Sequence, residues 1–72
     1  MINGYTRQEL IRLIIFRALQ KIASTITDLE VKASERVAMI HIENGHSACR
    51  AIEAGIKTGR ELISDRSVTT IF

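Results

Sequence analysis

The 72 residues of this chain suffice for one small domain, residues 1–72, which buries a smaller share of its surface than a larger protein does. With 46% hydrophobic and 25% charged residues and no proline, the composition excludes an intrinsically disordered chain. The net charge of +2 comes from ten basic and eight acidic residues that alternate along the sequence, which is a weak argument for nucleic-acid binding.

The cysteine count and the longest apolar run bear on the compartment. Cys49 is the only cysteine, and a secreted domain of this size usually carries several paired cysteines, so the cytoplasm is favoured. The apolar run from Leu13 to Phe16 lies between Arg12 and Arg17 and is too short to span a bilayer or to form a signal core. We therefore expect no membrane association and no targeting segment.

A first helix is predicted to begin at Thr6. Thr6 and Glu9 have the spacing of a capping box, in which each side chain accepts a hydrogen bond from the other residue's amide. The helix runs to about Ala23 or Thr25. Its predicted core face contains Ile11, Ile14, Ile15, Ala18, Leu19, Ile22 and Ile26. Leu13 and Phe16 lie outside this face, which indicates a second buried surface.

Two short runs of β-type pattern follow, residues 29–32 and 36–42, and Ala33-Ser34-Glu35 between them predicts a hairpin turn. In the second run Val37, Met39 and His41 alternate with other apolar residues, so both faces of the strand are largely apolar. This pattern is typical of a central strand. We expect a partner subunit to cover one of its faces.

A second helix is predicted from His46 or Ser47 to about Ile63. Ala51, Gly55 and Gly59 recur on its apolar face at intervals of four and form a smooth ridge. Glycine inside a helix costs roughly 1 kcal/mol relative to alanine, so we expect close helix–sheet packing to compensate. Residues 67–72 are rich in β-branched side chains and predict a last strand.

The resulting order, α-β-β-α-β, predicts an α/β fold: a ferredoxin-like sandwich with about three strands and two helices on one face of the sheet. Residues 1–3 add only a stub of strand. The second face of the sheet and its edges stay open, and self-association would cover them. The candidates for this homo-oligomer interface are Leu13, Phe16, Met39 and His41.

His46 and Cys49 form the one nucleophile-like pair, three residues apart at the start of the second helix. No third, orienting group accompanies them, and Cys49 shares the apolar face with Ile52, so we interpret it as a buried, unreactive cysteine. Together with His41, they match no standard zinc spacing and lack a fourth ligand. We therefore predict no catalytic residue, no cofactor and no metal site.

The first helix is basic, because Arg7, Arg12, Arg17 and Lys21 are balanced locally only by Glu9. Such a helix attracts nucleic acid or an acidic protein. Arg12 diverges from the other three by helical angle, and no aromatic stacking platform accompanies them. A solvated helix face is the simpler interpretation, so nucleic-acid binding stays open but is not favoured.

Three stretches resemble the shell-protein domain of bacterial microcompartments over roughly residues 16–72. They are Ala18-Leu19-Gln20-Lys21-Ile22-Ala23, similar to a helix ending in lysine and small residues; Ser47 to Gly55, similar to a helix closing in Glu-Ala-Gly; and Leu62-Ile63-Ser64 with Ser67 to Ile71, similar to a final strand. The family's first strand is reduced here to Met1 and Ile2. The turn at Ala33 to Glu35 matches the pore region but is short and lacks glycine.

The resemblance implies a cyclic hexamer that tiles into a protein sheet. It also implies that Lys21 matches the lysine that packs at hexamer edges, which adds Lys21 to the interface candidates. We therefore expect a self-assembling structural subunit, not an enzyme. Two alternatives stay open: an accessory or regulatory subunit of a larger complex, such as one encoded by a phage or mobile element, and a small nucleic-acid-binding domain that uses the basic first helix.

Overall fold

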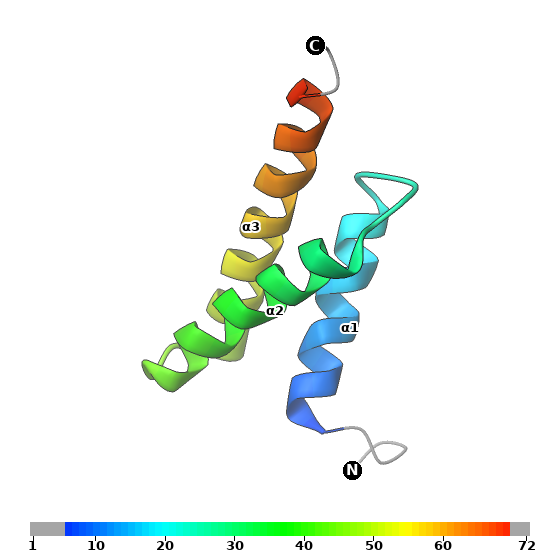
Figure 1. Ribbon diagram of the computed structural model, residues 1–72. Coiled ribbons are helices and arrows are strands. Elements are labelled where there is room, and N and C mark those ends of the chain that lie inside the picture. The colour runs from blue at the N-terminus through cyan, green and yellow to red at the C-terminus, as the bar shows by residue number, and fades with distance from the viewer. Residues whose placement is uncertain (1–5, 70–72) are drawn as a thin grey trace.

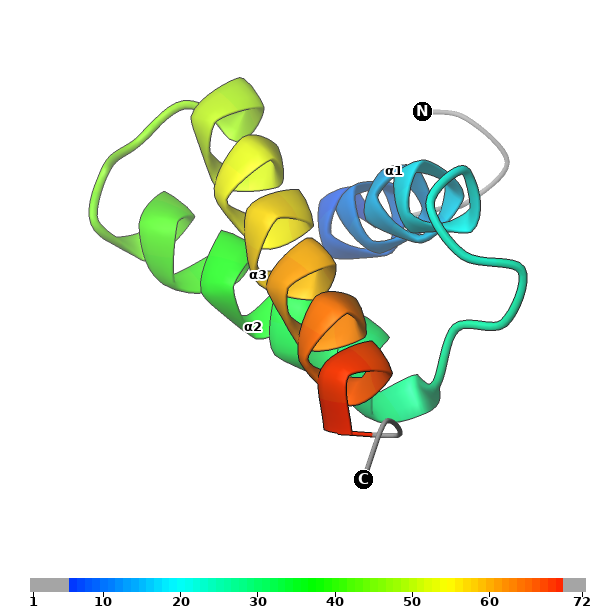
Figure 2. The same ribbon diagram turned by 90° about the horizontal axis from the view of Figure 1, so that it is seen from above.

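The computed structural model describes residues 6–69, with side chains for residues 6–65, and this part of the chain contains three α-helices and no strand. The helices are α1 (Arg7–Gln20), α2 (Asp28–Glu43) and α3 (Ala48–Thr69). Figures 1 and 2 show α1 beside α3, with α2 running diagonally across both. The predicted α/β sandwich is therefore wrong, and the chain folds as a small all-helical domain.

Helix α2 replaces the predicted hairpin, including the Ala33-Ser34-Glu35 turn. It begins with a second capping box: Thr27 Oγ1 accepts from the Glu30 amide at 3.2 Å, and Glu30 Oε1 accepts from the Thr27 amide at 3.0 Å. Glu30, Ser34 and Ala38 are buried at intervals of four, which is the helical period. The alternation over residues 36–42 is misleading, because three short-range signals of helix outweigh it: the cap, the period and the absence of glycine or proline up to Asn44.

The predicted capping box of α1 is confirmed, with hydrogen bonds of 2.9 and 3.1 Å between Thr6 and Glu9. The helix ends at Gln20, earlier than predicted, and Ile14 and Ile22 are 48% and 47% exposed and do not belong to the core. Helix α3 continues to Thr69, through the start of the predicted last strand. Residues 70–72 and the predicted strand stub at residues 1–3 lie outside the described residues.

The turn between α2 and α3 is fixed by the backbone. Gly45 has φ +86°. Its amide donates to Ile42 O at 3.0 Å, and the His46 amide donates to His41 O at 3.0 Å. These are the two bonds of a Schellman motif, which ends a helix and reverses the chain. Ser47 Oγ then accepts from the Arg50 amide at 3.2 Å and caps α3.

The core lies where rows of residues spaced by four meet. The row on α1 is Ile11, Ile15 and Leu19, and it packs with Ser34 and Ala38 of α2 and with Ala51, Gly55 and Gly59 of α3. A β-carbon on Gly55 would lie 2.7 Å from the Ser34 backbone oxygen and 2.9 Å from Ile15 Cδ1. The small-residue ridge on α3 therefore packs against two helices, where helix–sheet packing was predicted. Rows spaced by four that interdigitate are typical of close helix–helix packing.

In the range that the structure covers, no helix has the length and apolarity that a membrane crossing requires.

Candidate interaction surfaces

The residues considered for nucleophilic or metal chemistry, Cys49, His46 and His41, lie close in sequence between the end of α2 and the start of α3. Cys49 is exposed, so the prediction of a buried cysteine is wrong. Six residues before Gly55, it is turned by about 120° from the buried row of α3. The His46 ring packs against His41, with ring centroids 5.1 Å apart, and His41 Nδ1 lies 2.9 Å from Val37 O. Among the described residues, no three His, Cys, Asp or Glu side chains gather as a metal site.

The five predicted interface candidates do not form one surface. Leu13 is 36% exposed, and Lys21 is exposed at the C-terminal end of α1. Phe16 is half-buried and lines a groove of about 380 Å³ between α1 and α2. Met39 packs against the core, and His41 is half-buried beside His46. The strand interpretation placed Met39 and His41 on one face, but on a helix they are about 160° apart.

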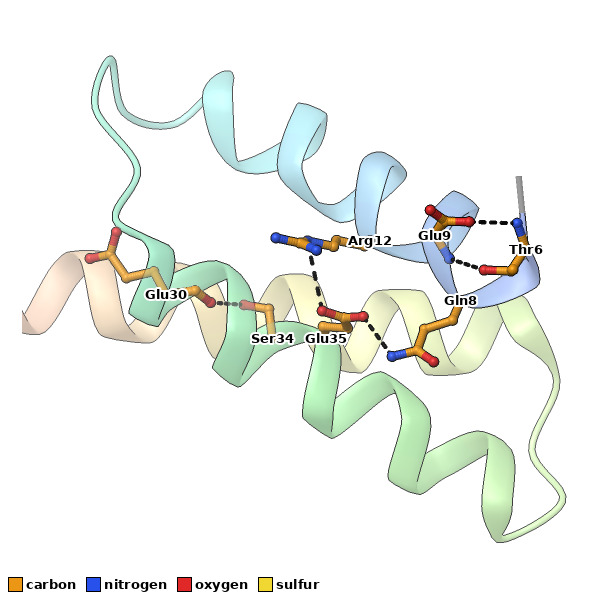
Figure 3. A network of polar contacts seen from close by, with 7 residues as sticks. All are labelled: Thr6, Gln8, Glu9, Arg12, Glu30, Ser34 and Glu35. Carbon is orange, nitrogen blue, oxygen red and sulfur yellow. Dashed lines mark hydrogen bonds and ion pairs between the residues drawn. The ribbon is translucent and has the colours of Figure 1, made fainter. Parts of the chain in front are cut away.

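A polar bridge joins α1 to α2 (Figure 3). Gln8 Nε2 donates to Glu35 Oε2 at 2.9 Å, and Arg12 Nε lies 3.8 Å from Glu35 Oε1. The Arg12 side chain is 54% exposed, so the ion pair contributes at most about 1 kcal/mol. Its main consequence is for the charge of α1, because Arg12 is turned toward α2 and neutralised locally by Glu35.

The side of α1 that points away from the core is both basic and apolar. Six residues form this α1 outer face, which combines three aliphatic and three cationic side chains: Arg7, Leu10, Leu13, Ile14, Arg17 and Lys21. All are exposed except Leu10, which is half-buried. Leu13 stands at the edge of this face, because it also lines the α1–α2 groove together with Glu9 and Arg12. None of the six residues is acidic, but the exposed Glu9, one helical turn before Leu13, borders the face.

A second apolar surface runs along α2. Leu29, Ala33, Val37 and Ile40, spaced by four, four and three, lie along one side of the helix and form what we term the α2 stripe. Leu29 is 76% exposed and Ile40 is 46% exposed, whereas Ala33 and Val37 are half-buried. The sequence analysis missed this surface because it assigned Leu29 and Ile40 to different strands of a hairpin.

A hollow of about 570 Å³ follows α3 and is lined by Glu53, Ile56, Lys57, Arg60, Glu61 and Ser64. Its two acidic and two basic side chains stand on one helix. Opposite charges three or four residues apart are typical of a solvated helix face and not of a binding site.

Comparisons with protein-family models, with curated proteins and with solved structures gave no match. The all-helical fold does not fit the α/β architecture that the resemblance to microcompartment shell proteins implies.

Proposed function

We propose that this chain is a non-catalytic protein-interaction module that self-associates through the α2 stripe. The observation that supports this proposal is the exposure of Leu29 and Ile40 in a domain whose largest fully buried apolar side chains are Ile15 and Leu19. Contiguous apolar patches on small proteins commonly mark contacts with other proteins. A second copy of the chain would remove the patch from water.

The α2 stripe is not covered by α1. Val31 lines the groove on the α1 side of α2, and Glu35 bonds to α1 directly. At 100° per residue, Ile40 lies on the opposite side of the helix from Val31, and Leu29 lies nearly opposite to it as well. Ala38, which packs against Gly55 of α3, also lies on the opposite side of α2 from Leu29 and nearly opposite to Ile40. The two exposed side chains of the stripe can therefore meet another molecule without replacing these contacts.

The stripe is also complementary to itself. When two α2 helices pair antiparallel about a two-fold axis, a residue that meets a second one is met by it in return. If Leu29 faces Ile40 of the second copy, Ala33 lies about one residue, ~1.5 Å along the helix, from the level of Val37 of the second copy. Small side chains at the centre allow the helices to approach, and the large exposed side chains at both ends bury each other. Self-association requires no further chain.

Sedimentation equilibrium of the purified chain at micromolar concentration tests this proposal. We expect a dimer for the wild type and a monomer for Leu29→Glu, which would place a carboxylate in the apolar interface. Leu29 lies in the first turn of α2, where a negative charge favours the helix, so this variant should keep its fold. Circular dichroism checks that it does.

Ile14→Gln is the matched control, since it also removes an exposed aliphatic side chain but lies on α1. It should remain dimeric. A wild type that is monomeric at high micromolar concentration, or a dimer that Leu29→Glu leaves intact, contradicts self-association through the α2 stripe.

We also propose that the module works in the cytoplasm. The single cysteine is exposed and has no intramolecular partner with which to form a disulfide. A reducing compartment keeps such a thiol free and prevents copies of the chain from becoming linked covalently.

A further inference from the structure

We propose that the α1 outer face binds an acidic amphipathic helix of a partner protein. This surface differs from the α2 stripe in position and in charge, so the inference does not depend on self-association. It rests on the pairing of three aliphatic side chains with three cations on one side of a single helix.

The cations of this surface are available to a partner. Arg7, Arg17 and Lys21 are exposed, and none of them forms an ion pair within the described part of the chain. Arg12, the fourth basic residue of α1, is held by Glu35 on the side that faces α2. Arg12 therefore helps to hold α1 against α2, whereas the other three cations form no ion pair with another described residue.

The aliphatic side chains lie between these cations along the helix. Leu10, Leu13 and Ile14 occupy the middle of α1, Arg7 stands before them, and Arg17 and Lys21 follow. Leu13 and Ile14 are 36% and 48% exposed. A helix that lays its own apolar residues across this middle and carries acidic residues toward both ends would satisfy both features. Helices that recognise each other through aliphatic anchors and flanking charges follow the same arrangement.

Two other occupants fit the surface less well. A second copy of the α1 outer face would bring like charges together, which disfavours binding. A phosphate backbone would pair with the cations but would leave Leu13 and Ile14 without an apolar contact. Protein–DNA interfaces are more polar than protein–protein interfaces, whereas half of the residues of this surface are aliphatic. An acidic helix is the occupant that uses all six residues.

The probe is a synthetic peptide of three heptads with leucine at the a and d positions and glutamate at the remaining exposed positions, labelled for fluorescence anisotropy. A peptide with glutamine in place of glutamate is its control. We expect the full chain to bind the glutamate peptide more tightly than the glutamine peptide. Added salt should weaken this binding, because the charges lie at an exposed interface.

Arg7→Glu is the decisive variant, because a glutamate in the first turn of α1 favours the helix while reversing the charge of the proposed surface. We expect the affinity to fall by roughly tenfold, as like charges at an interface disfavour binding. Arg60→Glu makes the same charge change at an exposed position on α3 and should change the affinity little. Ile14→Gln should weaken binding without changing the net charge.

Three results overturn the proposal. In the first, Arg7→Glu and Arg60→Glu weaken binding equally, which indicates attraction by net charge alone. In the second, Ile14→Gln has no effect, which leaves the aliphatic side chains without a role. In the third, a DNA duplex or vesicles with anionic headgroups bind at least as tightly as the glutamate peptide and respond to Arg7→Glu in the same way.

Discussion

Gly59 of α3 lies so close to Ser34 of α2 that a β-carbon on the glycine would be 2.6 Å from Ser34 Oγ. Ser34 is fully buried, and its hydroxyl donates to the Glu30 backbone oxygen at 2.7 Å (Figure 3). Both terminal methyl carbons of Leu19 would lie 2.7 Å from the same β-carbon. All three helices therefore meet at one point, and this point allows no side chain on α3.

Alanine at either buried glycine of α3 should destabilise the fold, and Gly55→Ala should cost more than Gly59→Ala. Overpacking of a core costs about 1–3 kcal/mol, against which alanine regains about 1 kcal/mol of helix propensity. The β-carbon at position 55 would meet the Ser34 backbone oxygen, whereas at position 59 it would meet side-chain atoms, which can move. Urea unfolding of both variants measures the difference.

Ser64→Ala is the control for these variants, since Ser64 is exposed on the same helix. Its unfolding free energy should stay within about 0.5 kcal/mol of the wild type. If Gly55→Ala instead proves more stable than the wild type, α2 and α3 do not approach each other as closely as the structure shows.

How much of this fold can be predicted from the sequence depends on which signal is given weight. The capping box at Thr6 predicts the start of α1 correctly. The same pattern at Thr27-Asp28-Leu29-Glu30, which the sequence analysis passed over in favour of a strand, marks the start of α2. The alternation of apolar residues over 36–42 instead predicts a strand, and this prediction is wrong because the segment belongs to α2. A stretch of alternating residues fits a strand or a helix buried on more than one side, and only the longer helical period separates the two.

The candidate surfaces are harder to predict, because they depend on which residues the other helices cover. The spacing of Ala51, Gly55 and Gly59 indicates a close approach but does not identify what approaches. The bond between Gln8 and Glu35 joins residues 27 positions apart and removes Arg12 from the exposed cations only once α1 and α2 are packed. Ile14 fits the predicted core face by angle, yet the packed helices leave it 48% exposed.

Thr27→Ala tests whether residues 28–43 form helix α2 instead of the predicted hairpin. Loss of an N-cap side chain costs roughly 0.5–2 kcal/mol. We expect the unfolding free energy to fall by about 1 kcal/mol and the amides of the first turn of α2 to exchange faster with solvent. Thr6→Ala, which removes the equivalent hydroxyl at α1, serves as the comparison and should speed exchange at α1 alone. Unchanged exchange over residues 28–31 in Thr27→Ala would contradict the cap.

Lowering the pH should destabilise the first turn of α1, because it protonates the Glu9 carboxylate of the capping box. The hydrogen bond from the Thr6 backbone amide to its carboxylate, followed by the Thr6 hydroxyl and the charge of Arg12, holds the pKa of Glu9 below its ordinary value of 4.5. A carboxyl with a lowered pKa in the folded state stabilises that state above pH 4.5, and the contribution is lost as the pH falls through the lowered value.

Nuclear magnetic resonance of the Glu9 side chain during an acid titration measures this shift. The titration midpoint should lie below that of the same residue in the urea-unfolded chain, and Thr6→Ala should raise it. A Glu9 midpoint that is equal in the folded and unfolded chains would show that the capping box does not hold in solution.

Cys49 should react with a thiol reagent in the native protein about as readily as in the unfolded chain. Its side chain is exposed on α3, turned away from the row that packs against α1 and α2. Protection of a thiol requires burial, and the structure provides none here. Cys49→Ala should therefore change the unfolding free energy by no more than about 0.5 kcal/mol, as is usual for exposed positions.

The measurement compares the rates at which the Cys49 thiol is labelled with and without urea at one pH. Labelling that is much slower in the folded protein, together with a marked loss of stability in Cys49→Ala, would restore the buried cysteine that the sequence alone predicts. Slow labelling that Leu29→Glu abolishes would instead show that self-association covers this end of α3.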